Sequence, residues 1–207
     1  MGDDDWLTTV KRLRAIAQTG LAYSQDPYDL ERYEELKVHA ERMLAALANT
    51  SPERIHDVYL MERGYPTPKV DLRAGVFRDG RILMVRERAD DRWSLPGGWA
   101  DEHQAPRVCI EREVIEESGY VVRAQRLVAV KDRDLHSYQA PTLQRVYKLF
   151  FLCELRGGEA RTGIETSGAE FFALDELPPL SLGRTIAEDV ELLRSHQLDA
   201  SAPCYVD

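Results

Sequence analysis

The segment LPGGWADEHQAPRVCIEREVIEESGY, Leu95 to Tyr120, places two adjacent glycines ahead of a run rich in acidic residues. Its second half, Pro106 to Ser118, predicts one helix, because proline is tolerated at the first helical position and Gly119 is suited to end the helix. At about 100 degrees per residue, three glutamates of this helix fall within an arc of roughly 100 degrees. These three are Glu113, Glu116 and Glu117. The sequence therefore predicts a helix with one acidic face.

The acidic face favours a bound divalent cation. Carboxylates three and four residues apart repel one another by a few tenths of a kcal/mol per pair, and a cation reverses the sign of that interaction. Mg²⁺ and Mn²⁺ prefer hard oxygen ligands, and the Gly97-Gly98 turn lets a backbone carbonyl approach the same ions. Arg112 is placed to orient a carboxylate, while Val108 and Ile115 are expected on the opposite, core-facing side. The alternative is a solvated helix face, which glutamate spacing alone favours.

The whole segment resembles the Nudix box, G-x5-E-x7-R-E-U-x-E-E-x-G-U, in which U is a bulky apolar residue. The matching residues, in register, are Gly98, Arg112, Glu113, Val114, Glu116, Glu117, Gly119 and Tyr120. Gln104 departs from the pattern, which has a glutamate there, and a neutral amide acts neither as a base nor as an anionic ligand. Glu102, two residues earlier, is a candidate partial substitute, and the alternative is that it faces solvent. The resemblance implies that Mg²⁺ or Mn²⁺ is held by Glu113, Glu116, Glu117 and the Gly98 carbonyl, with the glutamates as catalytic residues.

The resemblance extends over nearly the whole chain. It includes KVDLRAGVF, WSLPGGWAD, YKLFFLCEL, IETSGAEFFALDELP, PLSLGR and the N-terminal IAQTGLAYSQDPYDLERYEEL. They resemble a Nudix branch with a helical N-terminal extension, associated with hydrolysis of CDP-choline and ADP-ribose. The resemblance implies an α/β fold, an α/β/α sandwich with a mixed sheet. It also implies that the diphosphate bond of a nucleoside diphosphate linked to another group is hydrolysed, with CDP-choline preferred over ADP-ribose, and that a nucleoside monophosphate is released.

The chain is expected to divide into a helical unit, residues 1 to 65, and a Nudix domain, residues 66 to 207. Apolar spacing predicts three helices in the first unit, over about 5–20, 26–49 and 51–64, the first ending at Gly20. After the linker Pro66-Thr67-Pro68, alternating residues and the Asp79-Gly80 turn predict a hairpin of two strands. Further strands are expected over 120–131, 145–155 and 170–174, and a helix over 184–196.

The three N-terminal helices are too short to enclose a core alone. Their apolar stripes must therefore pack on the α/β domain or on another subunit. We predict a homodimer, in which these helices also help to shape the nucleotide pocket.

The Nudix resemblance also implies a general base outside the box, on a loop that faces the acidic helix. Glu165 lies on a loop between strands and is the candidate general base, with Glu170 behind it; the alternative is a solvated loop acid. Arg73 and Arg86 lie on the paired strands and are candidates to bind phosphate, because a guanidinium presents a fork suited to it; surface ion pairs are the alternative. Base stacking is conceivable for three aromatic residues, for which packing is the commoner role: Tyr23, Tyr28 and Trp99.

Composition narrows the functional classes. The 207 residues carry a formal net charge of −9, and the pI is about 5.1. This disfavours attraction to nucleic acid or to an anionic membrane, so a phosphorylated substrate requires bound cations or locally placed Arg and Lys. An RNA-acting enzyme is therefore disfavoured. A nucleotide-binding Nudix regulator without catalysis is supported by Gln104 alone.

Cysteine usage indicates the compartment. The three cysteines form no C-x-x-C pair and show no disulfide-like spacing, which fits a reducing environment. The N-terminus lacks the apolar core of a signal peptide, and no apolar run approaches about 18 residues. We expect a cytoplasmic protein with no membrane association.

Overall fold

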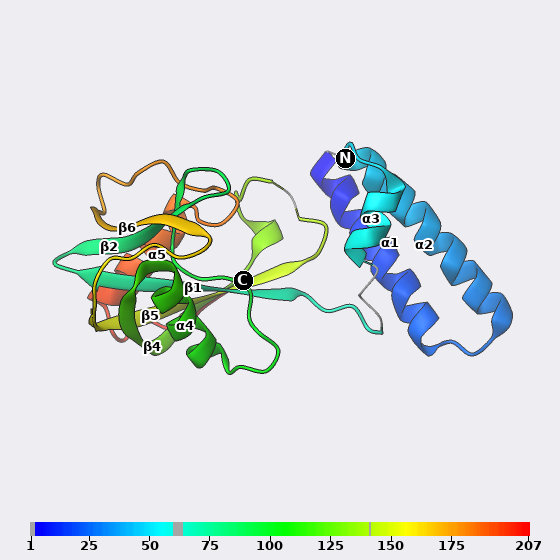
Figure 1. Ribbon diagram of the computed structural model, residues 1–207. Helices are drawn as coiled ribbons and strands as arrows, with labels where there is room; N and C mark the ends of the chain where they lie inside the picture. Colours follow the sequence, from blue (N-terminus) through cyan, green and yellow to red (C-terminus); the bar gives the residue numbers. More distant parts are fainter. Residues whose placement is uncertain (1–2, 60–63, 141) are drawn as a thin grey trace. The chain divides into compact units, whose positions relative to one another are not determined.

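The computed structural model describes residues 3–59, 64–140 and 142–207. The chain forms two compact units, Met1–Pro68 and Lys69–Asp207. The first is helical and the second is a mixed α/β domain (Figure 1).

The helical unit contains α1 Asp3–Tyr23, α2 Pro27–Leu47 and α3 Pro52–Tyr59. Asp26 caps α2, because its carboxylate accepts hydrogen bonds from the Tyr28 and Asp29 amides at 2.9 and 3.1 Å. The predicted end of α3 near Gly64 falls across residues 60–63, which lie outside the described residues.

The predicted end of α1 at Gly20 is wrong, because the helix continues to Tyr23. A Cβ at Gly20 would come within 2.4 Å of the Tyr33 ring of α2. Gly20 therefore allows the two helices to approach closely instead of ending the first one.

The α/β unit is built on a sheet in which the strand order is β3-β2-β1-β5-β4-β7, with β6 also paired to β2. The β1–β5 and β4–β7 pairs are parallel and the others are antiparallel, so the sheet is mixed, as predicted. The strands are β1 Lys69–Arg78, β2 Arg81–Glu87, β3 Trp93–Ser94, β4 Tyr120–Asp132, β5 Val146–Gly158, β6 Thr166–Ala173 and β7 Tyr205–Val206.

The hairpin between β1 and β2 confirms the sequence prediction. Asp79 and Gly80 both have positive φ, 52° and 73°, as a tight two-residue turn requires. By contrast, β3 and β7 are two residues each, too short for an alternating pattern to reveal them.

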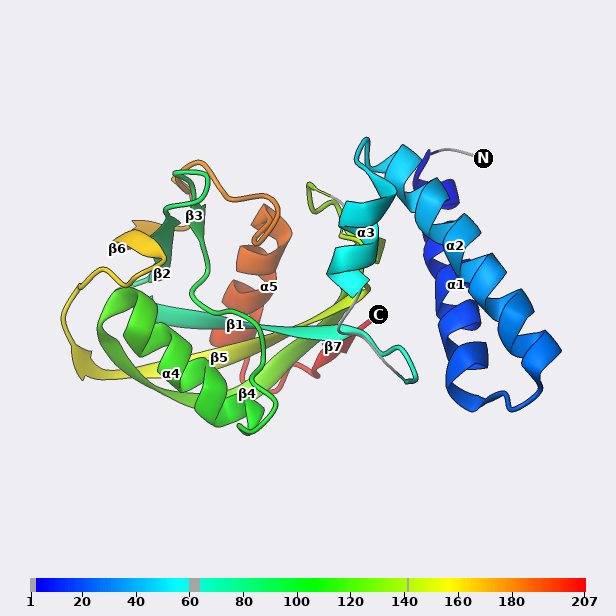
Figure 2. The ribbon, with the colours of Figure 1, turned by 45° about the vertical axis from the view of Figure 1, so that its right-hand side comes forward.

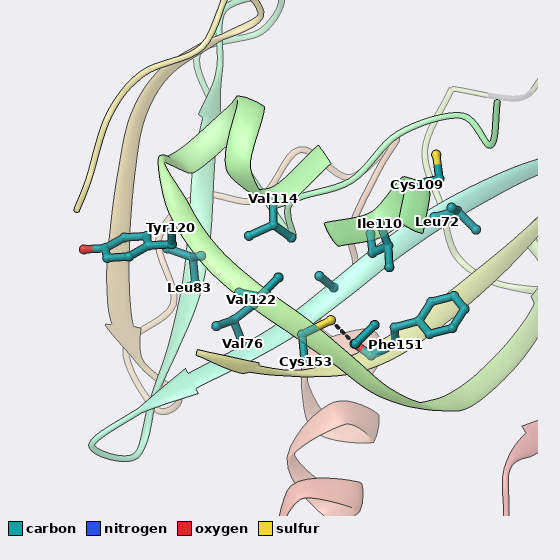
Figure 3. Close-up of a cluster of buried hydrophobic side chains, with 12 residues drawn as sticks. Leu72, Val76, Leu83, Cys109, Ile110, Val114, Tyr120, Val122, Phe151 and Cys153 are labelled. Atoms are coloured by element: carbon teal, nitrogen blue, oxygen red, sulfur yellow. Dashed lines mark hydrogen bonds between the residues drawn. The ribbon is translucent and has the colours of Figure 1, made fainter. Parts of the chain in front are cut away.

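Two helices cover the two faces of the sheet (Figure 2). Side chains of β5 alternate between them: Phe151 and Cys153 belong to the apolar cluster that includes α4, Pro106–Ser118 (Figure 3). Phe150 and Leu152 belong to the cluster that includes α5, Ala187–Leu198. The α/β/α sandwich expected from the sequence is confirmed.

Helix α5 begins at Ala187, three residues later than predicted. The Ser181 carbonyl accepts the Arg184 and Thr185 amides at 2.8 and 2.9 Å, so this stretch forms a turn. The Asp189 carboxylate then accepts the Ile186 amide at 3.0 Å and fixes the start of the helix.

Candidate active site

The bounds of α4 are those predicted, but its core-facing side is not. Val108 and Ile115 are 55% and 44% exposed, so the prediction that they face the core is wrong. Cys109, Ile110 and Val114 are fully buried instead. The core stripe is centred beside Glu117, so the acidic face adjoins the core rather than lying opposite to it.

The glycine turn before α4 lies directly against β1. The Gly98 carbonyl accepts the Leu72 amide at 2.8 Å, and the Pro96 carbonyl accepts the Ala74 amide at 2.9 Å. Gly97 has a φ of 137°, and a Cβ there would come within 2.1 Å of the Leu72 carbonyl oxygen. Only glycine fits this approach. The Gly97 amide then donates to a Glu117 carboxylate oxygen at 2.8 Å, which ties the turn to the helix.

Burial makes a negative charge costly at two of the three glutamates. Burial raises the pKa of Glu117 to about 8, opposed by Arg73 and the Gly97 amide and reinforced by Glu87 and Glu113. The pKa of Glu113 is raised as well, first by burial, with Arg112 opposing the shift. Additional positive charge close to these two carboxylates would therefore stabilise their ionised form.

Arg112 donates hydrogen bonds to several carboxylates of the site. Its Nη2 donates to Asp101 at 2.6 Å and to Glu113 at 2.7 Å, and its Nη1 donates to Glu116 at 2.9 Å. Its Nε donates to the Gln104 amide oxygen at 3.2 Å. Gln104, the departure from the Nudix box, thus retains a role that needs only a neutral acceptor.

A cavity of about 1010 Å³ brings most of the predicted site together. It is lined by Arg73, Gly98, Glu113, Glu116, Glu117 and Glu165. Arg86 lies outside the lining of this cavity, and its guanidinium pairs with the exposed Asp91 at 2.7 Å. Glu102 is exposed, also outside the lining.

The cavity lining also includes ionic residues that the sequence did not reveal. They are Asp71, Glu87, Arg133, Lys148 and Arg184. Lys148 is 2% exposed, and its ammonium pairs with the Asp71 carboxylate. The available signal was a charged residue at an inward position of an otherwise apolar strand, as in YKLFFLCEL.

Arg73 has a different environment from the one its prediction assumed. Its Nε and Nη2 donate to Asp71 at 3.1 and 2.9 Å, and its Nη1 donates to the Leu95 carbonyl at 3.0 Å. All three nitrogens thus have protein partners. Arg73 reaches the cavity as part of a buried, mutually satisfied pair.

Within the described ranges, no group of three or more His, Cys, Asp or Glu side chains is arranged to hold a metal ion. The glutamates instead accept hydrogen bonds from Arg112 and from Gly97. The donors themselves are carboxylate oxygens, which suit Mg²⁺ and Mn²⁺. The raised pKa values of Glu113 and Glu117 indicate that added positive charge would stabilise these two carboxylates. The residues therefore fit a divalent cation by chemistry and charge.

The sandwich fold and its acidic, glycine-bordered cavity define the class of Nudix pyrophosphatases. The chain belongs to the Nudix family, because the model of the NUDIX domain matches residues 70–194. A second family model, described as "UDP-X-like, N-terminal oligomerisation domain", matches residues 4–59. The chain is thus a Nudix hydrolase with an added helical unit.

Similar proteins and solved structures agree with the assignment to Nudix hydrolases. The "Putative ADP-ribose pyrophosphatase YjhB" of Bacillus subtilis is 46% identical over 91% of this chain and 90% of that protein. The crystal structure of a UDP-X diphosphatase is 33% identical over the whole of both chains, with a TM-score of 0.63. That of an ADP-ribose pyrophosphatase from Streptococcus suis is 39% identical over 68% of this chain and 100% of its own, with a TM-score of 0.60.

Across the described parts of the chain, every helix is too short or too polar to cross a bilayer.

Proposed function

We propose that this protein uses Mg²⁺ or Mn²⁺ to hydrolyse the diphosphate bond of a nucleoside diphosphate linked to another group, releasing a nucleoside monophosphate. One observation carries the proposal. Glu113 and Glu117 line a cavity of nucleotide size and both have raised pKa values. A fold gains little by burying carboxylates in this way unless cations accompany the ligand.

The proposed metal ligands are Glu113, Glu116 and Glu117, together with a carbonyl of the glycine turn. When bound, divalent ions offset phosphate charge and make water a better nucleophile. The Gly98 carbonyl already accepts the Leu72 amide, which leaves one lone pair for a cation. In the described part of the chain no hydrogen bond ends on the Gly97 carbonyl, so we add this oxygen as a second candidate.

Arg112 is proposed to position the ligands. It contacts Asp101, Glu113 and Glu116, so a single guanidinium sets the spacing of carboxylates that come from α4 and from the loop before it.

Glu165 is proposed as the general base. It is exposed on the cavity wall, and its carbonyl accepts the Arg88 amide at 2.9 Å, which fixes its backbone beside β2. A carboxylate in this position would take a proton from the attacking water.

For the substrate, we retain CDP-choline as the first choice and ADP-ribose as the second. The names of the relatives, ADP-ribose pyrophosphatase and UDP-X diphosphatase, support the wider class of nucleoside diphosphate derivatives. Trp99 lines the cavity and is 58% exposed, so its indole face is available to stack on a base.

A substrate panel tests the proposal. CDP-choline, ADP-ribose, UDP-glucose and NADH are incubated with Mg²⁺ or Mn²⁺, and nucleoside monophosphate is quantified by chromatography. We expect release from at least one compound, at a rate that collapses in Glu113→Gln and persists in Arg86→Gln, the control outside the cavity. Absence of nucleoside monophosphate from every compound would refute the proposed activity.

We also propose that the helical unit forms a homodimer and helps to shape the nucleotide pocket in it. The matching family model is described as an oligomerisation domain. The unit also leaves large apolar side chains exposed, among them Trp6 at 41%, Met43 at 39% and Leu47 at 41%. Such a surface is typical of a contact with another subunit. Light scattering at micromolar concentration is expected to give the dimer mass, and a purely monomeric result would contradict this proposal.

We also propose a cytoplasmic location. Cys109, Cys153 and Cys204 all lie in the described ranges and all are unpaired. Free thiols of this kind are ordinary in a reducing compartment.

A further inference from the structure

Arg133 is a buried cation on the wall of the cavity. It begins the short 3-10 helix η1 Arg133–Leu135, directly after β4. The residue is only 6% exposed and lines the same cavity as the glutamates.

The other cations of this cavity are paired with carboxylates. Arg73 and Lys148 contact Asp71, Arg112 contacts three acids, and Arg184 pairs with Glu87 at 3.3 Å. No carboxylate lies within ion-pair distance of the Arg133 guanidinium in the described ranges of the chain. The carboxylates of Asp134 and Asp71 attract the Arg133 guanidinium from a longer distance, without forming an ion pair with it. A buried charge that lacks a direct counter-ion is costly, which favours an anionic ligand as its partner.

Backbone carbonyls hold Arg133 in place without neutralising it. Its Nη2 donates to the Gln139 and Ala140 carbonyls, both at 2.7 Å, and to the Gly183 carbonyl at 3.3 Å. The Tyr138 ring lies 5.5 Å from the guanidinium carbon. Among the described residues, neither Nε nor Nη1 donates to a protein atom. One nitrogen is therefore fixed, and the remaining donors of a planar fork are available to a ligand.

A second buried network supports the loop around Arg133. The Tyr138 hydroxyl donates to both Asp189 oxygens at 2.6 and 2.7 Å. Asp189 is fully buried and pairs with Lys131 at 2.7 Å. The segment that follows Arg133 is thus anchored to α5, and the guanidinium is held in advance of ligand binding.

The strand order places Arg133 away from the glycine turn. In the backbone register of the sheet, Asp71 of β1 lies opposite Trp99 on one side and opposite Lys148 of β5 on the other. Lys148 in turn lies opposite Lys131 of β4. Three strand spacings separate the backbone of the turn from that of β4, about 14 Å in all. The backbone of Arg133, directly after β4, therefore lies well apart from that of the glycine turn, although both line one cavity.

We infer that Arg133 binds anionic oxygens of the phosphate that is not held at the acidic helix. The diphosphate would then lie between two walls, one of carboxylates with their cations and one with an unpaired guanidinium. Such a fork suits phosphate and does not attract the quaternary ammonium of choline. The inference rests on the proposed substrate class, because it assumes a diphosphate.

Equilibrium binding tests the inference without turnover. Calorimetry in EDTA compares CDP and ADP with cytidine and adenosine, which lack phosphate. Arg133→Gln is expected to weaken nucleotide binding at least about 10-fold and to leave nucleoside binding unchanged. Arg133→Lys should recover part of the loss, and Arg86→Gln, which removes an exposed arginine outside the cavity, should match wild type.

Thermal unfolding of each variant shows that the fold is retained. Equal nucleotide affinity in wild type and in a folded Arg133→Gln variant would overturn the inference. So would an equal loss for the nucleosides, because the contact would then be with base or ribose. The result is independent of the substrate panel: a protein that hydrolyses nothing but loses nucleotide affinity in Arg133→Gln would refute the proposed activity and support the phosphate contact.

Discussion

Glu117→Gln is the substitution that examines the acidic helix most closely. Glu117 is 8% exposed, accepts the Gly97 amide at 2.8 Å, and has a pKa raised to about 8 by burial. A glutamine retains an oxygen for the Gly97 amide and removes the titrating proton. The substitution therefore isolates the electrostatic cost of a carboxylate in this position.

The magnitude follows from the two pKa values. Glutamate in an unfolded chain has a pKa of about 4.3, whereas that of Glu117 in the folded chain is about 8. Because the folded value is higher, the group's stabilising contribution is fully present below about pH 4 and is lost as the pH rises to about 8. Each pH unit within this window costs about 1.4 kcal/mol, and structural relaxation lowers the total. We expect a loss of about 2 to 4 kcal/mol between pH 5 and pH 8.

The assay is urea unfolding in EDTA at several pH values from 5 to 8. The free energy of unfolding of the wild type should fall relative to that of Glu117→Gln by the stated amount as the pH rises. Glu116→Gln, which changes an exposed carboxylate (55% side-chain exposure), is the control and should follow the wild type. Added Mn²⁺ should restore the stability of the wild type at pH 8 but not that of Glu117→Gln. Parallel pH profiles for the wild type and Glu117→Gln would refute the reasoning.

Three further predictions follow from the same geometry. Gly97→Ala should lower the free energy of unfolding by about 1 to 3 kcal/mol, because a Cβ would come within 2.1 Å of the Leu72 carbonyl; urea unfolding measures this, and Gly80→Ala, where the added Cβ has open space, should cost less. Arg112→Ala should weaken Mn²⁺ binding about 10- to 100-fold in calorimetry, with partial recovery in Arg112→Lys, and equal affinity would remove its positioning role. Glu165→Gln should reduce kcat about 100-fold with little change in KM; an unchanged kcat would exclude it as the base.

Local signals predicted part of this fold well. Pro106 and Gly119 mark the two ends of α4, and the Asp79-Gly80 turn marks the hairpin. These features depend on backbone conformations that few residue types adopt, so the residue types alone predict them.

Features that depend on tertiary packing could not be predicted in this way. Gly20 was expected to end a helix, but it accommodates the Tyr33 ring of a neighbouring helix. The exposure of Val108 and Ile115 depends on how α4 is rotated against the sheet, which helical spacing alone leaves open. Hydrophobic periodicity predicts that a helix is present more reliably than it predicts which residues that helix packs against.

The site shows the same division. The Nudix box located Glu113 and Glu117, since their spacing is local, and Glu165 also lines the cavity. Lys148 lies on β5 and Arg133 on η1 after β4, and they meet the box residues at one cavity only through the order of the strands. Arg86 was a candidate phosphate ligand because it lies on β2, one of the paired strands, but in the fold its guanidinium pairs with Asp91.

The central claim is that the carboxylates of α4 hold divalent cations against a diphosphate. Calorimetric titration of Mn²⁺ into the protein, with a methylene-bridged nucleotide analogue present, tests it most directly. Binding should be detected in the wild type and be lost when Glu113 and Glu117 are both replaced by glutamine. Equal Mn²⁺ uptake by that folded double variant, or no uptake by the wild type, would contradict the account.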